Sequence, residues 1–296
     1  MSSPPPVEER VSVHEGRRLR WVRLGEGDPL LLCHGFIGAA ESFRTWFEPL
    51  ARRRTLVVAD LPGCGASDPL DGRHTADTLA AALEPLLDEL GVSRFDLGGI
   101  CLGAAVACAL ERRRPDAVNA LVMDTPLLGA GFVRRGFRMQ VRALTAAPVF
   151  PAVARLGQYR RVSDLYRRIL VEGDDWDGAA ADLNFANQQR ALPRAAREWL
   201  SDGLRRDDSA TVAGRAGPTL LLAAADDRIA DVARLEALAA GRPTIELAVL
   251  DGAGHGWNES KVRRQLAIIG DFLDRHPVPR PAERVATRGG RSPGPA

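Results

Sequence analysis

A cysteine between glycines is the first candidate for chemistry in this chain. The sequence Gly99-Ile100-Cys101-Leu102-Gly103 lies between a segment that predicts a buried strand and one that predicts a helix of small residues. Small residues let the backbone make the sharp strand-to-helix turn that presents a nucleophile. The helix dipole would favour the thiolate at this position. Cys101 is therefore a candidate nucleophile. The alternative is a buried structural cysteine in a glycine-rich turn.

The segments around this turn alternate between apolar strands and helices. Strands are predicted at 7–13, 18–24, 30–33, 55–59, 95–100, 117–123, 218–224 and 244–250. Helices are predicted at 75–90, 101–113, 230–239 and 260–275. Apolar strands that alternate with helices indicate an α/β protein, with a mostly parallel sheet covered on both faces.

One long stretch, 127–216, shows only helical pattern and polar connections. Inserted between two sheet strands, it would form a lid over the carboxyl ends of the strands, where open α/β sheets bind ligands. We therefore expect a core of 7–126 and 217–276 and a helical lid of 127–216. The ends, 1–6 and 277–296, are rich in Pro, Gly, Ser or Arg and are predicted to be disordered tails.

Five motifs in a fixed order resemble the α/β-hydrolase superfamily. They are His34-Gly35-Phe36, Asp60-Leu-Pro-Gly-Cys-Gly-Ala-Ser-Asp68, the turn around Cys101, Ala224-Ala-Asp-Asp227 and Gly252-Ala-Gly-His255. The order of nucleophile, acid and histidine is that of the superfamily. The resemblance covers roughly residues 7–276 and implies an α/β-hydrolase fold with a lid insertion.

The resemblance also implies a catalytic triad. Cys101 would be the nucleophile, and His255 would take its proton or hold it in a thiolate–imidazolium pair. Asp227 would orient His255 and stabilise its charged form. Asp124 is the main alternative acid, because some members of the superfamily place their acid after the strand that follows the nucleophile helix. Asp226, next to Asp227, also stays open.

An oxyanion hole is implied in the same way. The backbone N–H groups of Phe36 and Leu102 would stabilise the tetrahedral intermediate. The motif residues that support these two loops are His34, Gly35, Gly99 and Gly103. This chemistry needs no cofactor, and the five histidines form no cluster with metal-ligand spacing, so neither a metal nor an organic cofactor is predicted.

Cysteine in place of serine shapes the predicted reaction. An acyl group on Cys101 is a thioester, so acylation by a thioester substrate changes the free energy little. The acyl group therefore stays activated for the next nucleophile. We expect acyl transfer through this intermediate, with Dieckmann-type cyclisation as the sharpest version. The chain is similar in this respect to the Dieckmann cyclases and cyclising thioesterases of natural-product pathways. The alternatives are an ester or thioester hydrolase and a non-catalytic ligand receptor on the same fold.

Composition and charge narrow the classes of partner. The 296 residues carry a net charge of +2 and are 45% hydrophobic, which excludes a disordered chain and gives no support for nucleic-acid binding. Between 134 and 168 there are nine arginines and one acid, Asp164, a local charge of 9 − 1 = +8. That cluster could steer an acyl substrate bound to a carrier protein or to coenzyme A, the alternative being a solvated helix face.

The location in the cell is predicted from three absences. The start of the chain, MSSPPPVEER, lacks the basic and apolar regions of a signal peptide, and no apolar stretch is long enough to cross a membrane. The four cysteines show no paired spacing. We therefore expect a cytoplasmic protein without membrane partners.

Overall fold

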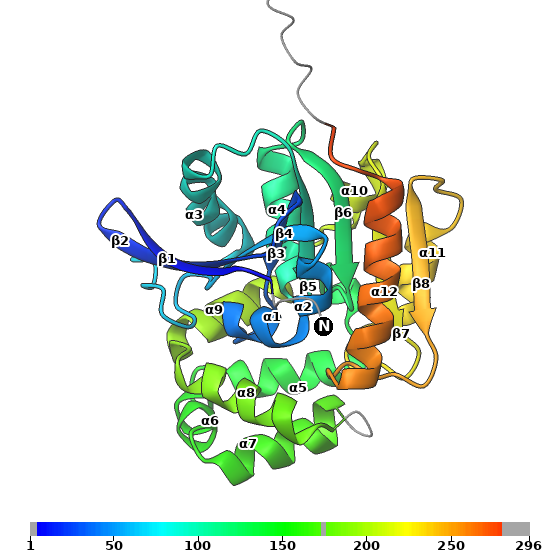
Figure 1. The fold of residues 1–296 in the computed structure, drawn as a ribbon. Coiled ribbons are helices and arrows are strands. Elements are labelled where there is room, and N and C mark those ends of the chain that lie inside the picture. Colours follow the sequence, from blue (N-terminus) through cyan, green and yellow to red (C-terminus); the bar gives the residue numbers. More distant parts are fainter. Residues whose placement is uncertain (1–4, 173–175, 280–296) are drawn as a thin grey trace, which may run out of the picture.

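A twisted sheet of eight strands forms the centre of the molecule in a computed structural model that describes residues 5–172 and 176–279 (Figure 1). The strands are β1 (Val7–His14), β2 (Arg17–Leu24), β3 (Asp28–Cys33), β4 (Arg54–Ala59), β5 (Phe95–Ile100), β6 (Val118–Asp124), β7 (Thr219–Ala224) and β8 (Ile245–Leu250). Their order in the sheet is β1-β2-β4-β3-β5-β6-β7-β8. Only the pairs β1·β2 and β2·β4 are antiparallel. The predicted α/β class with a mostly parallel sheet is confirmed.

Helices cover both faces of this sheet. The elements outside the β6–β7 insertion are α1 (Ala40–Trp46), α2 (Glu48–Ala51), α3 (Ala76–Glu89), α4 (Gly103–Arg113), α11 (Val232–Ala239) and α12 (Glu259–Arg275). Alternate strand residues point to opposite faces and so build two cores. One core contains α3, α4 and α11, and the other contains α1, α2 and α12. Burial on both faces explains why β4, β5 and β7 are unbroken runs of buried residues.

Local signals fix several helix ends. The Thr75 hydroxyl accepts the backbone N–H of Thr78, and the Thr78 side chain accepts the N–H of Thr75, which forms a capping box at the start of α3. Gly91 follows that helix with φ of 63°, a left-handed conformation that suits glycine. Helices α1 and α2 were not predicted, because elements of 7 and 4 residues are too short to show helical periodicity.

A group of helices connects β6 to β7 and lies beyond one end of the sheet (Figure 1). They are η1 (Ala130–Phe132), α5 (Arg135–Thr145), α6 (Phe150–Leu156), α7 (Arg160–Arg167), η2 (Arg168–Glu172), α8 (Gly178–Gln189), α9 (Pro193–Gly203) and α10 (Ser209–Gly214). We call residues 127–216 the lid. The lid is tied to the core through α9, where the Glu198 carboxylate accepts the His74 backbone N–H and contacts its ring Nδ1 at 3.0 Å.

The predicted tails fall mostly on 1–4 and 280–296, which lie outside the described residues. In the ranges that the structure describes, no helix has the length and apolarity needed to cross a membrane.

Candidate active site

The turn that carries Cys101 joins β5 to α4. Cys101 has φ of +53°, a strained conformation for a residue with a side chain. The residues two positions before and after it have no room for a side chain. A Cβ on Gly99 would lie 2.6 Å from the Cα of Ala104, and a Cβ on Gly103 would lie 2.2 Å from the carbonyl oxygen of Cys33. The turn therefore holds Cys101, half-buried, at the start of α4.

His255 and Asp227 are brought together from the loops after β8 and β7. The distance from His255 Nδ1 to Asp227 Oδ2 is 2.8 Å. The other carboxylate oxygen, Oδ1, accepts the backbone N–H groups of Ile229 and Ala230 at 2.7 and 2.8 Å. Asp227 is only 1% exposed. Two amides thus fix the carboxylate in the orientation that meets the imidazole.

The electrostatics of this pair favour a protonated imidazole. Burial alone would lower the pKa of His255, but the negative charge of Asp227 and the contact with Cys101 outweigh it and raise the pKa to about 10. Burial tends to raise the pKa of Asp227, and the charge and hydrogen bond of His255 hold it below its usual range. The site can therefore keep a proton on His255 at neutral pH, beside an ionised Asp227.

Two backbone amides lie close to Cys101. Among the described residues, no acceptor for the N–H of Phe36 or of Leu102 is found. A Cβ on Gly35 would lie 3.2 Å from Cys101 Cβ, so the Phe36 loop passes directly beside the cysteine. The His34 ring braces this loop by accepting the Leu61 N–H at Nε2 and donating from Nδ1 to the Gly35 carbonyl at 2.9 Å. Such free amides can stabilise an oxyanion.

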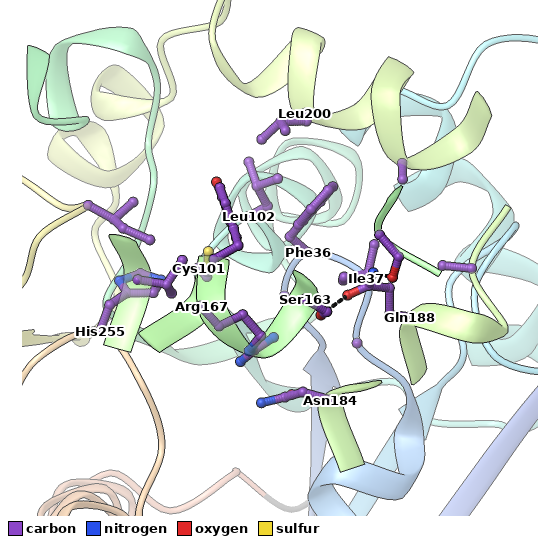
Figure 2. A pocket seen from close by; sticks show the side chains of 18 of the residues that line it. Phe36, Ile37, Cys101, Leu102, Ser163, Arg167, Asn184, Gln188, Leu200 and His255 are labelled. Carbon is purple, nitrogen blue, oxygen red and sulfur yellow. Dashed lines mark hydrogen bonds between the residues drawn. The ribbon is translucent and has the colours of Figure 1, made fainter. Parts of the chain in front are cut away.

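A cavity of about 590 Å³ opens above Cys101, between the strand ends and the lid. Figure 2 shows the sulfur of Cys101 among Phe36, Leu102 and His255, with Leu200 of α9 across from them. The lid contributes much of the remaining wall. In the described ranges no group of three or more side chains has the composition of a metal site.

Comparison with known proteins identifies the fold family. A family model described as alpha/beta hydrolase fold matches residues 28–261. The chain belongs to the α/β-hydrolase family.

Relatives of this α/β hydrolase differ in what their names describe. It is 28% identical to the 2-hydroxymuconate semialdehyde hydrolase of Pseudomonas sp. strain CF600, over 92% of this chain and 97% of that protein. It is 30% identical to the polyketide synthase ThaQ of Burkholderia thailandensis over 83% of this chain, but spans only 12% of ThaQ. A thermophilic esterase from Thermogutta terrifontis has the same fold, with a TM-score of 0.75, 23% identity and coverage of 91% of this chain and 100% of that one.

The two other aspartates of the α/β hydrolase lie differently from Asp227. Asp124, at the end of β6, is buried, and its Oδ1 accepts the side-chain amide of Gln265 at 2.6 Å. Burial raises the pKa of Asp124. Asp226 is exposed, and its backbone N–H donates to the Ala253 carbonyl. Of the three candidates, Asp227 is the one that the structure joins to His255, while the catalytic roles themselves stay predictions.

Lys261 is a residue of the site that sequence reasoning missed. It lies on α12 and is 2% exposed. Its ammonium donates to the carbonyls of Gly254 and Gly256, on either side of His255, the latter at 2.8 Å. The Lys261 charge also stabilises ionised Asp124, beside which it lies. One signal was available: Lys261 is the only lysine in the chain.

Proposed function

We propose that this α/β hydrolase is an acyl-transfer enzyme in which Cys101 is the nucleophile, His255 the base and Asp227 the acid. One observation carries the proposal: a cysteine in a strained turn shares a buried cavity with a histidine that an aspartate holds at 2.8 Å. Thiolate, imidazole and carboxylate in this order are the parts of a nucleophilic triad.

The first step acylates the enzyme. The Cys101 thiolate attacks the carbonyl carbon of a thioester substrate, and the amides of Phe36 and Leu102 hold the oxyanion. The new C–S bond remains as the bond to the leaving sulfur breaks, and His255 gives its proton to the departing thiolate. Asp227 keeps the imidazole oriented throughout.

The second step discharges the thioester on Cys101. A C–H, amine or hydroxyl group of the same substrate gives its proton to His255, the resulting carbanion, nitrogen or oxygen nucleophile attacks the acyl carbon, and the Cys101 thiolate leaves. Because exchange between thioesters is nearly level in free energy, the acyl group remains reactive for this step. Intramolecular cyclisation of Dieckmann type is the version we favour. The apolar wall around Cys101, which limits the access of water, supports it.

Hydrolysis is the second candidate, and the names of relatives favour it. The similar proteins include a semialdehyde hydrolase and an esterase. Water would then be the nucleophile of the second step, and the product would be a free acid. The similarity to ThaQ, a polyketide synthase, supports thioester-bound substrates instead.

The test is the mass of the intact protein after mixing with acyl and β-ketoacyl-aminoacyl thioesters, with Cys101→Ala as control. We expect an adduct on Cys101, followed by a product that is lighter than the substrate by the thiol alone. An adduct that discharges to free acid would establish the hydrolase. If no thioester gives an adduct or turnover, and ligands bind Cys101→Ala as tightly as the wild type, the chain is a receptor and the proposal is wrong.

We further propose that the acyl group arrives on a carrier protein in the cytoplasm. Of the nine arginines between 134 and 168, six are exposed: Arg134, Arg135, Arg142, Arg155, Arg161 and Arg168. Others are neutralised, such as Arg160 by Asp164 and Asp182. Exposed positive charge favours an acidic partner or the phosphates of coenzyme A. Salt should then reduce turnover of carrier-bound substrate steeply and leave small thioesters unaffected. Equal salt sensitivity would contradict docking.

A further inference from the structure

We infer that the acyl chain of the substrate ends in a carboxylate, and that Arg167 in the lid recognises it. This inference rests on the proposed acylation of Cys101. It begins with the polar side chains in the cavity wall. Around Cys101 the lining includes the apolar side chains of Phe36, Leu102 and Leu200. The wall formed by α7 and α8 carries polar side chains, Ser163, Arg167, Asn184 and Gln188, among apolar ones such as Val162 and Leu183. Figure 2 shows these four side chains on the lid side of the site.

Arg167 is held in place from one side. Its side chain is 18% exposed, and both Nε and Nη2 donate to one oxygen of Glu172, with Nε at 2.8 Å. Glu172 itself is buried and does not line the cavity. The contact with Glu172 uses one edge of the planar guanidinium. In the described part of the chain nothing accepts a hydrogen bond from Nη1. Arg167, which lines the cavity, is therefore a positively charged group held in place by Glu172, with N–H donors still available to a ligand.

Among the polar neighbours of Arg167, Asn184 offers a further hydrogen-bond donor to a ligand. Ser163 gives its hydroxyl proton to Gln188 at 2.9 Å, a bond drawn in Figure 2. The Gln188 amide donates in turn to the Gly157 carbonyl. These two side chains are thus committed to each other and to the lid backbone. Asn184 lines the same wall, and its amide can add a second donor beside Arg167.

A carboxylate fits these groups better than other anions. Its two oxygens lie in one plane and match the free edge of a guanidinium. Glu172 already pairs with Arg167 and opposes a further anion, and it opposes a singly charged carboxylate less than a doubly charged phosphate. Because Glu172 orients the guanidinium before substrate arrives, little side-chain freedom is lost on binding. The apolar residues that line the cavity suit the methylene chain that would join the carboxylate to the thioester.

The test compares matched thioesters of N-acetylcysteamine, with the far end either a carboxylate or the neutral carboxamide of the same size, over a series of chain lengths. At the best length we expect kcat/KM to be roughly 10- to 100-fold higher for the carboxylate, the range for a hydrogen bond to a charged group. Arg167→Gln should abolish this preference. Arg161→Gln, an exposed arginine on the same helix, is the matched control and should keep it.

A second variant, Glu172→Gln, keeps the test valid if Arg167→Gln fails to fold. Glu172→Gln leaves the guanidinium in place but unbalanced, so the preference for the carboxylate should persist or grow, and its loss would overturn the inference. Equal reaction of both termini at every length in the wild type would also overturn it, while an adduct on Cys101 in the same samples would leave the proposed function standing. If neither series of thioesters gives an adduct on Cys101, the proposed function is wrong, and the inference about Arg167, which rests on it, is wrong with it.

Discussion

The strand-end site and the lid are built in opposite ways. At the strand ends the candidate functional groups are held by backbone, as when two amides hold Asp227 and close-packed glycines shape the turn of Cys101. In the lid, large apolar side chains are exposed, with Leu165 61% and Ile169 54% exposed, and α6 has no buried residue. If the proposed function holds, the comparison teaches that the chemistry is placed where the backbone fixes each group, and that selection of the substrate is left to the more loosely packed lid helices.

Asp227→Asn should have the largest effect. Asparagine keeps the shape of the side chain but removes the charge that stabilises the imidazolium, so we expect kcat/KM to fall by roughly 10³- to 10⁴-fold with little change in fold. The matched control is Asp124→Asn, on the neighbouring strand, which should lower kcat/KM less than tenfold. Steady-state kinetics with one thioester measure kcat/KM for both variants. A larger loss of kcat/KM in Asp124→Asn than in Asp227→Asn would make Asp124 the acid.

Lys261→Met probes how the strand-end site is held together. The change removes the buried ammonium that donates to the carbonyls of Gly254 and Gly256 on either side of His255, so the free energy of unfolding should fall by about 3 kcal/mol. Because the loop of His255 loosens, kcat should fall while KM stays nearly constant. In the double variant Lys261→Met/Asp124→Asn, the buried carboxylate whose charge Lys261 offsets is also removed. This double variant should therefore recover part of the lost stability. Urea titrations of both variants measure this, and purely additive losses would show that the two charges are not coupled.

The same contrast explains what sequence reasoning could reach. The strands and the turn at Cys101 were predictable, because continuous apolar runs and close-packed glycines are local features. The choice among Asp124, Asp226 and Asp227 was not, since all three follow strands and only side-chain distances separate them. The polar wall of the cavity was also out of reach. Ser163 and Arg167 sit in an amphipathic pattern that predicts a helix but does not say which face meets the cavity.

The pH dependence of stability should report the buried ion pair at the strand ends. The pKa of His255 is raised to about 10 in the folded protein, against about 6.5 when unfolded. The folded state therefore gains stability from the imidazolium in full below pH of about 6.5 and loses it as the pH rises toward 10. For Asp227, whose pKa is lowered, the gain is lost as the pH falls through the acid range. Tm should decline between pH 7 and 10 more steeply in the wild type than in His255→Gln, and parallel curves would contradict the pairing.

Leu200→Ala, in the lid, should have the smallest effect and the most selective one. Leu200 faces Cys101 from α9 and is half-buried in the lid itself, so its truncation removes apolar contact with the acyl chain without touching the triad. We expect KM for apolar thioesters to rise several-fold, as for the loss of a few methylene contacts, while the rate of acylation of Cys101 at saturation is unchanged. Leu165→Ala, 61% exposed on the outer lid, is the matched control and should change neither. Rapid-mixing mass measurements separate the two quantities. If Leu200→Ala also lowers the rate of acylation at saturating substrate, the lid affects the geometry of the reacting groups as well as binding. The contrast between strand ends that carry the chemistry and a lid that only selects the substrate would then be wrong.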